Sequence, residues 1–316
     1  MNSKKEENYR IKIGSLNFKT PFNLFLKNIC HETLDTMIMH KNLNVEGADN
    51  KISKCSIILF NTKIVKSDII DSTKFIEKKE KLDSVEIFEL KQIYDIDFEI
   101  KENTYILKII IISANVSGGN KPLNSSLLKI IFDNINEGKV FKYFLEKNKN
   151  IYWQEYLEKN VPILPPYIYQ YHFFLTKLNS RGTEENRLII LTDKYLLNVE
   201  YQINFNKKTD PTPKDFEFKI VKSKWAISID SFEEIQIMGK DKKKKMKPND
   251  MMIKIKISTK KNKEFFNKQK TLPFKNKSSV DFIFNSEKLG RFFIYQIKRL
   301  FFDITKTNSI KVIESS

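Results

Sequence analysis

The stretch "FIFNSEKLGRFFIYQI", residues 282–297, joins the end of a β-rich run to an aromatic segment with helical spacing. Residues 130–145, "IIFDNINEGKVFKYFL", repeat this order, and Gly138 and Gly290 lie at matching places, 152 positions apart. A cation follows each glycine. Ser286 is placed to cap the second helix, with Glu287 in the first turn. Both stretches therefore predict a last strand that runs into a closing helix.

The repeat extends upstream of this motif, because four more pairs of segments keep the same order along the chain. The pairs are residues 37–47 with 173–182, 57–65 with 189–197, 86–93 with 227–235, and 105–113 with 251–258. Short β-rich runs separated by polar loops come first in each copy, and one amphipathic helix closes it. In the second copy we expect separate strands at residues 216–221 and 224–229. The pattern predicts a tandem duplication of a mainly β (α+β) unit.

Strands followed by one helix, with about 130 residues per copy, resemble the layout of a pleckstrin-homology-like (PH-like) barrel. The resemblance implies two tandem PH-like barrels, each closed by a C-terminal helix. Thr20 and Pro21 are typical of a helix start, which adds an N-terminal helix. The expected parts are a segment with this helix at residues 1–35, domain 1 at 36–158, a proline-rich linker at 159–166, domain 2 at 167–306 and a tail at 307–316.

The stretch "KLNSRGTEENRLIILTDKYLLNV", residues 177–199, resembles two PH-like groups. One is the tail homology domain of class I myosins, and the other is the Sac-phosphatase-associated homology domain. In the second group a long basic loop follows, and here "GKDKKKKMKPND", residues 239–250, takes that place. The resemblance covers residues 167–304. It implies a peripheral membrane protein, because both groups are membrane-peripheral and many PH-like domains bind phosphoinositides.

The resemblance also implies lipid-binding residues. Lys177 and Arg187 match the basic positions of strands one and two, and Arg181 lies in the loop between them. The pattern departs at Ile189, where a cation is expected, and two glutamates in the loop oppose a phosphate. The densest charge cluster supplies the remaining candidates, which are Lys240, Lys242, Lys243, Lys244, Lys245 and Lys247.

Each lysine near an anionic bilayer contributes about 1 kcal/mol, so this lysine loop could hold a peripheral protein. It could equally be a nuclear-import patch, a nucleic-acid contact or a solvated hairpin loop. The matching loop of the first copy contains Glu46 and Asp49, so that copy resembles a scaffold more than a lipid-binding domain.

Composition constrains the partners. The chain of 316 residues has a net charge of +17, yet only five of its 56 basic residues are arginine. Nucleic-acid readers favour arginine, so nucleic acid is a less favoured partner, and part of the lysine excess could be compositional. Two cysteines, Cys30 and Cys55, and a polar N-terminus fit a reducing cytoplasmic location. Trp153 and Trp225 have apolar neighbours, which predicts core positions.

No catalytic signature occurs. The three histidines are far apart, "HETLD" lacks the second histidine of a zinc protease helix, and phosphate-binding glycine motifs are missing from the sequence. We therefore expect no enzyme, no catalytic residue, no metal site and no cofactor.

The sequence thus favours a cytoplasmic, peripheral membrane adaptor that binds anionic lipid, with phosphoinositide as the specific candidate. An unidentified protein partner is also expected, and the chain could form a homo-oligomer. Two alternatives stay open. One is a protein-interaction scaffold that does not bind lipid, and the other is a nuclear tandem-domain protein that binds nucleic acid or a chromatin partner.

Overall fold

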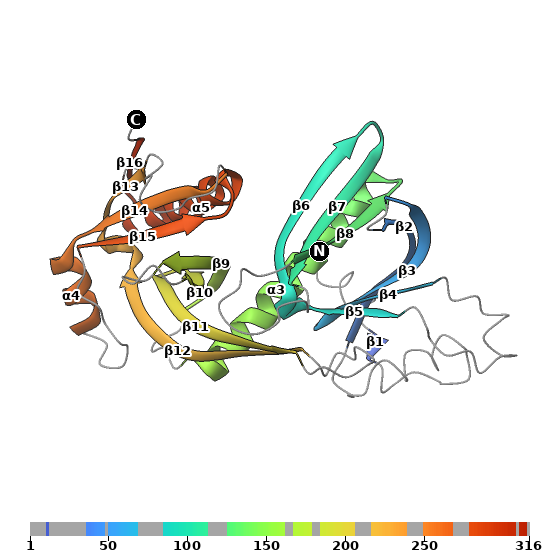
Figure 1. Cartoon of the computed structure of the whole chain (residues 1–316), viewed down its shortest axis with the longest axis horizontal. Helices are drawn as coiled ribbons and strands as arrows, with labels where there is room; N and C mark the ends of the chain where they lie inside the picture. Colours follow the sequence, from blue (N-terminus) through green and yellow to red (C-terminus); the bar gives the residue numbers. More distant parts are fainter. Residues whose placement is uncertain are drawn as a thin grey trace, which may run out of the picture. The chain divides into compact units, whose positions relative to one another are not determined.

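Figure 1 shows the strands and helices that the computed structural model describes. The described residues are 11–12, 36–47, 50–68, 85–112, 125–161, 167–178, 184–205, 216–238, 249–267, 278–307 and 310–314. The predicted N-terminal helix at Thr20 and Pro21 lies outside these residues, as does most of the predicted linker. The structure describes two compact units that divide within helix α3 (Ile135–Asn160), between Trp153 and Gln154.

Unit 1 contains one eight-stranded antiparallel sheet and the first part of α3. Its main path runs β5-β4-β3-β2-β8-β7-β6, and β1 pairs with β2. A short 3-10 helix, Leu90–Gln92, separates β5 from β6. The strands are β1 (Ile11–Lys12), β2 (Thr36–Glu46), β3 (Ile52–Phe60), β4 (Lys63–Asp68), β5 (Glu86–Glu89), β6 (Ile93–Lys101), β7 (Thr104–Ile112) and β8 (Ser125–Phe132).

Alternation along the strands places the core of unit 1 between the sheet and α3. Tyr105, Leu107 and Ile109 on β7 are buried, whereas the intervening residues are partly exposed. Phe141 and Leu145, four residues apart on α3, are fully buried in the same cluster.

Unit 2 contains two four-stranded sheets. The first has the order β12-β11-β10-β9, and the second has the order β15-β14-β13-β16. All pairs of known register are antiparallel except β13 with β16, which is parallel. The strands are β9 (Tyr169–Leu178), β10 (Glu184–Thr192), β11 (Tyr195–Phe205), β12 (Phe216–Ser228), β13 (Phe232–Met238), β14 (Met251–Ile257), β15 (Ser279–Phe284) and β16 (Lys311–Glu314).

Besides the second part of α3, the described part of unit 2 contains helices α4 (Thr259–Asn267) and α5 (Glu287–Thr305). Helix α5 lies against β14 and β15 (Figure 1). Ser286 caps α5 as predicted, since its Oγ accepts a hydrogen bond from the N–H of Leu289 at 3.4 Å. Leu289, Phe293 and Ile297 lie on the buried stripe of the helix.

The strand-to-helix motif of residues 130–145 and 282–297 has the same local structure in both units. Phe132 at the end of β8 pairs with Tyr105 on β7, and the ring of Tyr105 lies against Gly138 of α3. In unit 2, the last residue of β15 pairs with Met251 on β14, and Met251 lies against Gly290 of α5. Glycine is needed at position 138 because a Cβ there would lie 2.3 Å from the Tyr105 ring. A Cβ on Gly290 would lie 2.5 Å from the Met251 sulfur, which belongs to a more flexible side chain.

The predicted class, mainly β with a few helices, is confirmed, and Trp153 and Trp225 are buried as expected. Closed barrels are not confirmed, because the described strands form three open sheets. The break predicted near residues 222–223 is wrong. Residues 216–228 form one strand, β12, since "VKSK" contains no glycine, proline or asparagine to turn the chain. Helix α4 and strand β16 are not predicted by the sequence pattern.

Candidate functional site

Arg187 is the predicted lipid-binding residue whose side chain the structure describes. It lies on β10, opposite Leu175 of β9, just before the buried run Leu188–Leu191. Only 9% of Arg187 is exposed, so the guanidinium is largely shielded from solvent. A buried cation requires polar or acidic neighbours, because desolvation of an isolated charge is costly.

Glu200 on β11 is an acidic neighbour of Arg187. A hydrogen bond from Lys224 on β12 is the main cause that lowers the pKa of Glu200, and the charges of Lys224 and Arg187 lower it further. Lys224 and Glu200 also form an ion pair. The carboxylate of Glu200 thus lies among cations of β10 and β12. Because Glu200 already offsets part of this positive charge, Arg187 has less charge to offer a phosphate group.

Lys177 lies on β9, and the register places it opposite Glu185 on β10. Arg181 lies outside the described residues. Lys177 and Arg187 are therefore on neighbouring strands, as the sequence predicts, and each lies at a register position close to an acidic residue. Their proposed role in lipid binding stays a prediction.

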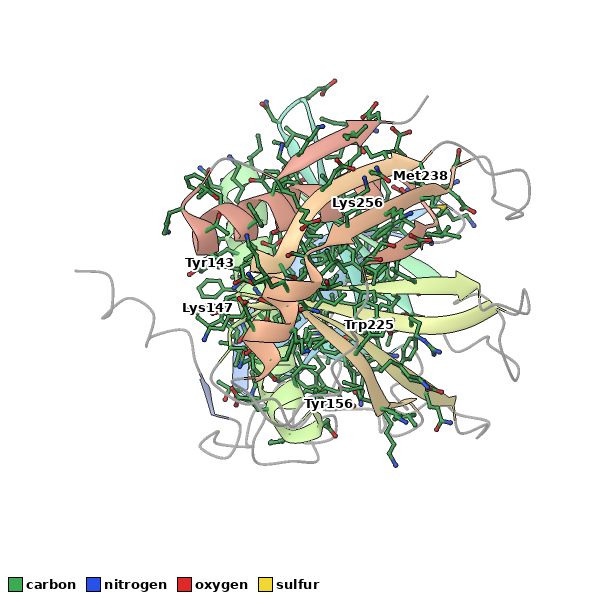
Figure 2. The ribbon with its side chains drawn as sticks, turned by 90° about the vertical axis from the view of Figure 1, so that its left-hand side faces the viewer. Tyr143, Lys147, Tyr156, Trp225, Met238 and Lys256 are labelled. Carbon is green, nitrogen blue, oxygen red and sulfur yellow. The ribbon has the colours of Figure 1, made fainter. Side chains whose placement is uncertain are left out.

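The six loop lysines lie outside the described residues, but the structure describes the strands that hold the loop. Met238, the last residue of β13, pairs with Met252 of β14, and further along the same ladder Glu234 pairs with Lys256. Figure 2 labels Met238 and Lys256 on these two strands. The lysine loop therefore connects two antiparallel partners at one end of their sheet.

The same end of the sheet adjoins the first turn of α5. Met251 follows the loop directly, and its side chain lies against Gly290. The residue after Gly290, Arg291, forms ion pairs with Glu287 and with Glu314 of β16. The lysine loop thus ends beside the start of α5 and the end of β16.

Sequence reasoning did not find Glu200. No motif marks this glutamate, because its proximity to Arg187 depends on the register between β10 and β11. A strand register shifted by one residue would move every side chain to the other face. The sequence alone does not fix that register.

Among the described residues, no group of three or more histidine, cysteine, aspartate or glutamate side chains is arranged to hold a metal ion. None of the described helices combines the length and the apolar run needed to cross a bilayer.

Comparison with known proteins gives distant likenesses to solved structures. No protein-family model matches the chain, and no curated protein matches it. The hSac2 domain from human phosphoinositide phosphatase Sac2 is a solved structure with a TM-score of 0.31 and 10% sequence identity to this chain. The match covers 56% of this chain and 89% of the hSac2 domain. A likeness of this size leaves fold and function to be argued from the residues of the chain itself.

Proposed function

We propose that this protein is a non-enzymatic, cytoplasmic, peripheral membrane adaptor that binds anionic lipid through the lysine loop of unit 2. The observation that carries the proposal is the position of that loop. A segment with six lysines in eight residues, 240–247, joins two paired strands at the end of a sheet. Such a segment presents concentrated positive charge at close range, which attraction to a bilayer requires, because salt screens charges beyond about 8 Å.

The proposed mode of binding is diffuse electrostatic attraction to anionic lipid rather than specific binding of one headgroup. A specific headgroup site at Lys177 and Arg187 would need cations that are free to contact phosphate. Glu200 lies close enough to Arg187 for the arginine to lower its pKa, and Glu185 is the register partner of Lys177. The Glu200 carboxylate would oppose a phosphate at this place. We therefore assign the main attraction to the loop.

We also infer that the two units are PH-like domains. The strands can be numbered within each unit, from one at β2 in unit 1 and from one at β9 in unit 2. In both units, neighbouring strands then follow the orders 4-3-2-1 and 7-6-5. In unit 1 the seventh strand, β8, pairs with the first, β2. In unit 2 the corresponding strands, β15 and β9, meet through the rings of Phe173 and Phe284, whose centroids are 5.8 Å apart. A common strand order supports a common origin of the two units.

Vesicle co-sedimentation tests the lipid proposal. The full chain is mixed with vesicles of phosphatidylcholine alone, with added phosphatidylserine, and with added phosphoinositides, at low and at near-physiological salt. The main variant changes Lys243, Lys244 and Lys245 to glutamine. The matched control changes three exposed lysines of α4 in the same unit, Lys260, Lys261 and Lys263, to glutamine, so that the loss of charge is equal.

The proposal expects binding to anionic vesicles that weakens as salt rises. The loop variant should lose most of this binding, and the α4 control should keep it. Equal loss in both variants would mean that net charge alone drives binding, which would overturn the assignment to the loop. Absence of binding by the unchanged chain would overturn the membrane proposal. The protein-interaction scaffold would then be favoured, as the acidic neighbour of Arg187 suggests.

A further inference from the structure

We propose that the outer face of α5 is a second membrane-contacting surface, which places aromatic rings in the headgroup region of an anionic bilayer. This inference rests on the proposed function and extends it. The outer face of α5 is defined as one stripe of six exposed residues along the helix and its C-cap. These residues are Lys288, Arg291, Tyr295, Arg299, Phe302 and Lys306.

The spacing of these residues places them on one side of the helix. They recur at intervals of three or four positions, so at 3.6 residues per turn they form a continuous stripe. The opposite side is the buried side, where Phe293, Ile297 and Leu300 pack into the core of unit 2. The stripe alternates cations with aromatic rings, and none of its six residues is acidic.

Two large aromatic side chains of the stripe are exposed. Tyr295 is 62% exposed and Phe302 is 53% exposed, whereas Phe293, only two positions from Tyr295, is fully buried. The core of unit 2 therefore does not need these two rings. Tyrosine is enriched where a bilayer meets water, and basic side chains are attracted to anionic lipid, so exposed rings beside cations suit the surface of an anionic bilayer.

The cations of the stripe are held at the surface. The Nη2 of Arg299 donates a hydrogen bond to Oε1 of Gln170 at 3.0 Å, which is a neutral partner. Arg291 is paired with Glu287 and Glu314, but about half or more of each of these side chains is exposed. Exposed ion pairs of this kind contribute little stability, so phosphate groups can compete with them.

An anionic bilayer fits this surface better than a second protein for two reasons. Charge complementarity favours an anionic partner at the C-terminal half of the stripe, where Arg299 and Lys306 lie, whereas two glutamates offset the charge of Arg291. The start of the stripe also lies near the end of β13, the strand that leads into the lysine loop, because Arg291 pairs with Glu314, and Glu314 is the register partner of Ile237. A flat anionic surface that attracts the loop would therefore meet the start of the stripe as well.

The test separates the aromatic rings from the charges. A double variant, Tyr295→Ser with Phe302→Ser, removes both exposed rings and leaves every charge in place. A matched control, Val140→Ser with Tyr143→Ser, removes two exposed apolar side chains from the outer side of α3 in unit 1. Partition into phosphatidylserine vesicles at near-physiological salt should fall about tenfold for the α5 variant. The control should bind like the unchanged chain.

A second readout reports contact directly. The variant Tyr295→Trp introduces an exposed indole, whereas both native tryptophans are buried. Lipids brominated near the headgroup should quench its fluorescence when the protein binds. Equal vesicle binding by the α5 double variant and the unchanged chain, or an unquenched indole on bound protein, would overturn this inference and leave the proposed function standing. Failure of the unchanged chain to bind vesicles would overturn both.

Discussion

Lys149 on α3 gives the sharpest prediction about stability. Its side chain is only 3% exposed, and burial is the main cause that lowers its pKa from 10.5 to about 8. The charges of Asp95 and Glu146 act in the opposite direction but do not offset the burial. The folded protein therefore holds this proton more weakly than the unfolded chain does.

The sign of the effect follows from proton binding. Between about pH 8 and pH 10.5 the unfolded chain binds a proton at Lys149 that the folded protein has lost. The free energy of unfolding therefore rises with pH across this window. A shift from 10.5 to about 8 corresponds to about 3 kcal/mol, at about 1.4 kcal/mol per pKa unit. Below pH 8 the charged lysine destabilises the fold by this amount.

The variant Lys149→Met removes the charge and keeps a long apolar side chain at the position. We expect it to increase the free energy of unfolding at pH 7 by about 1–3 kcal/mol. This gain is smaller than the full effect of burial, because Asp95 loses the attraction of the lysine charge. The difference from the unchanged chain should shrink to near zero by about pH 10.5.

Denaturant unfolding at pH 7, 8, 9 and 10 measures this difference. Fluorescence of Trp153, one turn further along α3, reports on the relevant unit in a Trp225→Phe background. Lys139→Met, at an exposed position of the same helix, is the control and should change stability little. If Lys149→Met lowers stability at pH 7, or if its effect does not depend on pH, the reasoning from burial is wrong.

Three further variants test the packing and the charges of the two units. Gly138→Ala should lower the unfolding midpoint, at a cost of about 1–3 kcal/mol, because its Cβ would clash with the Tyr105 ring. Gly290→Ala should cost less, since the flexible thioether of Met251 can move, and equal costs in thermal unfolding would contradict this difference. Glu200→Gln should cost at most about 1 kcal/mol at pH 7. Because the folded pKa of Glu200 is lowered, this cost should fade as pH falls below about 4, and a cost that persists at pH 3 would contradict the charge argument.

The sequence predicts the closing motif well because its determinants are local. A serine cap, a helical apolar stripe and a glycine in the first turn are read within about 16 residues, and the structure places all three as expected in α5. The alternation of isoleucine and lysine on β14 is equally local, and its isoleucines are buried.

Other elements depend on contacts that are distant in sequence. Strand β16 contains only four residues and exists as an edge strand through its parallel pairing with β13. Helix α4 is short and rich in lysine, and it is positioned in part by Asn262, whose side-chain oxygen accepts a hydrogen bond from the N–H of Ser228 at 3.1 Å. Neither contact is visible in a local pattern, because local preference for such short elements is weak.

The candidate site also combines a feature that is local in sequence with one that depends on distant contacts. Charge density along the chain identifies the lysine loop without any knowledge of the fold. The value of Arg187 as a phosphate ligand depends instead on its burial and on Glu200, and both follow from strand register. A motif that matches in sequence can therefore lose its chemistry through one neighbouring carboxylate.

The exposed residues of the two closing helices, α3 and α5, can be compared position by position. Tyr143 of α3 and Tyr295 of α5 occupy matching positions in the repeat, and both are exposed, at 54% and 62%. On α3 the exposed stripe continues with Lys139, Val140 and Ile151, and the Nζ of Lys147 lies 5.8 Å from the centre of the Tyr143 ring, whereas on α5 the stripe continues with arginines and a second aromatic ring. Both helices thus carry cations beside an exposed tyrosine, and they differ in the second exposed aromatic ring of α5. This second ring supports the proposed lipid contact by α5 of unit 2.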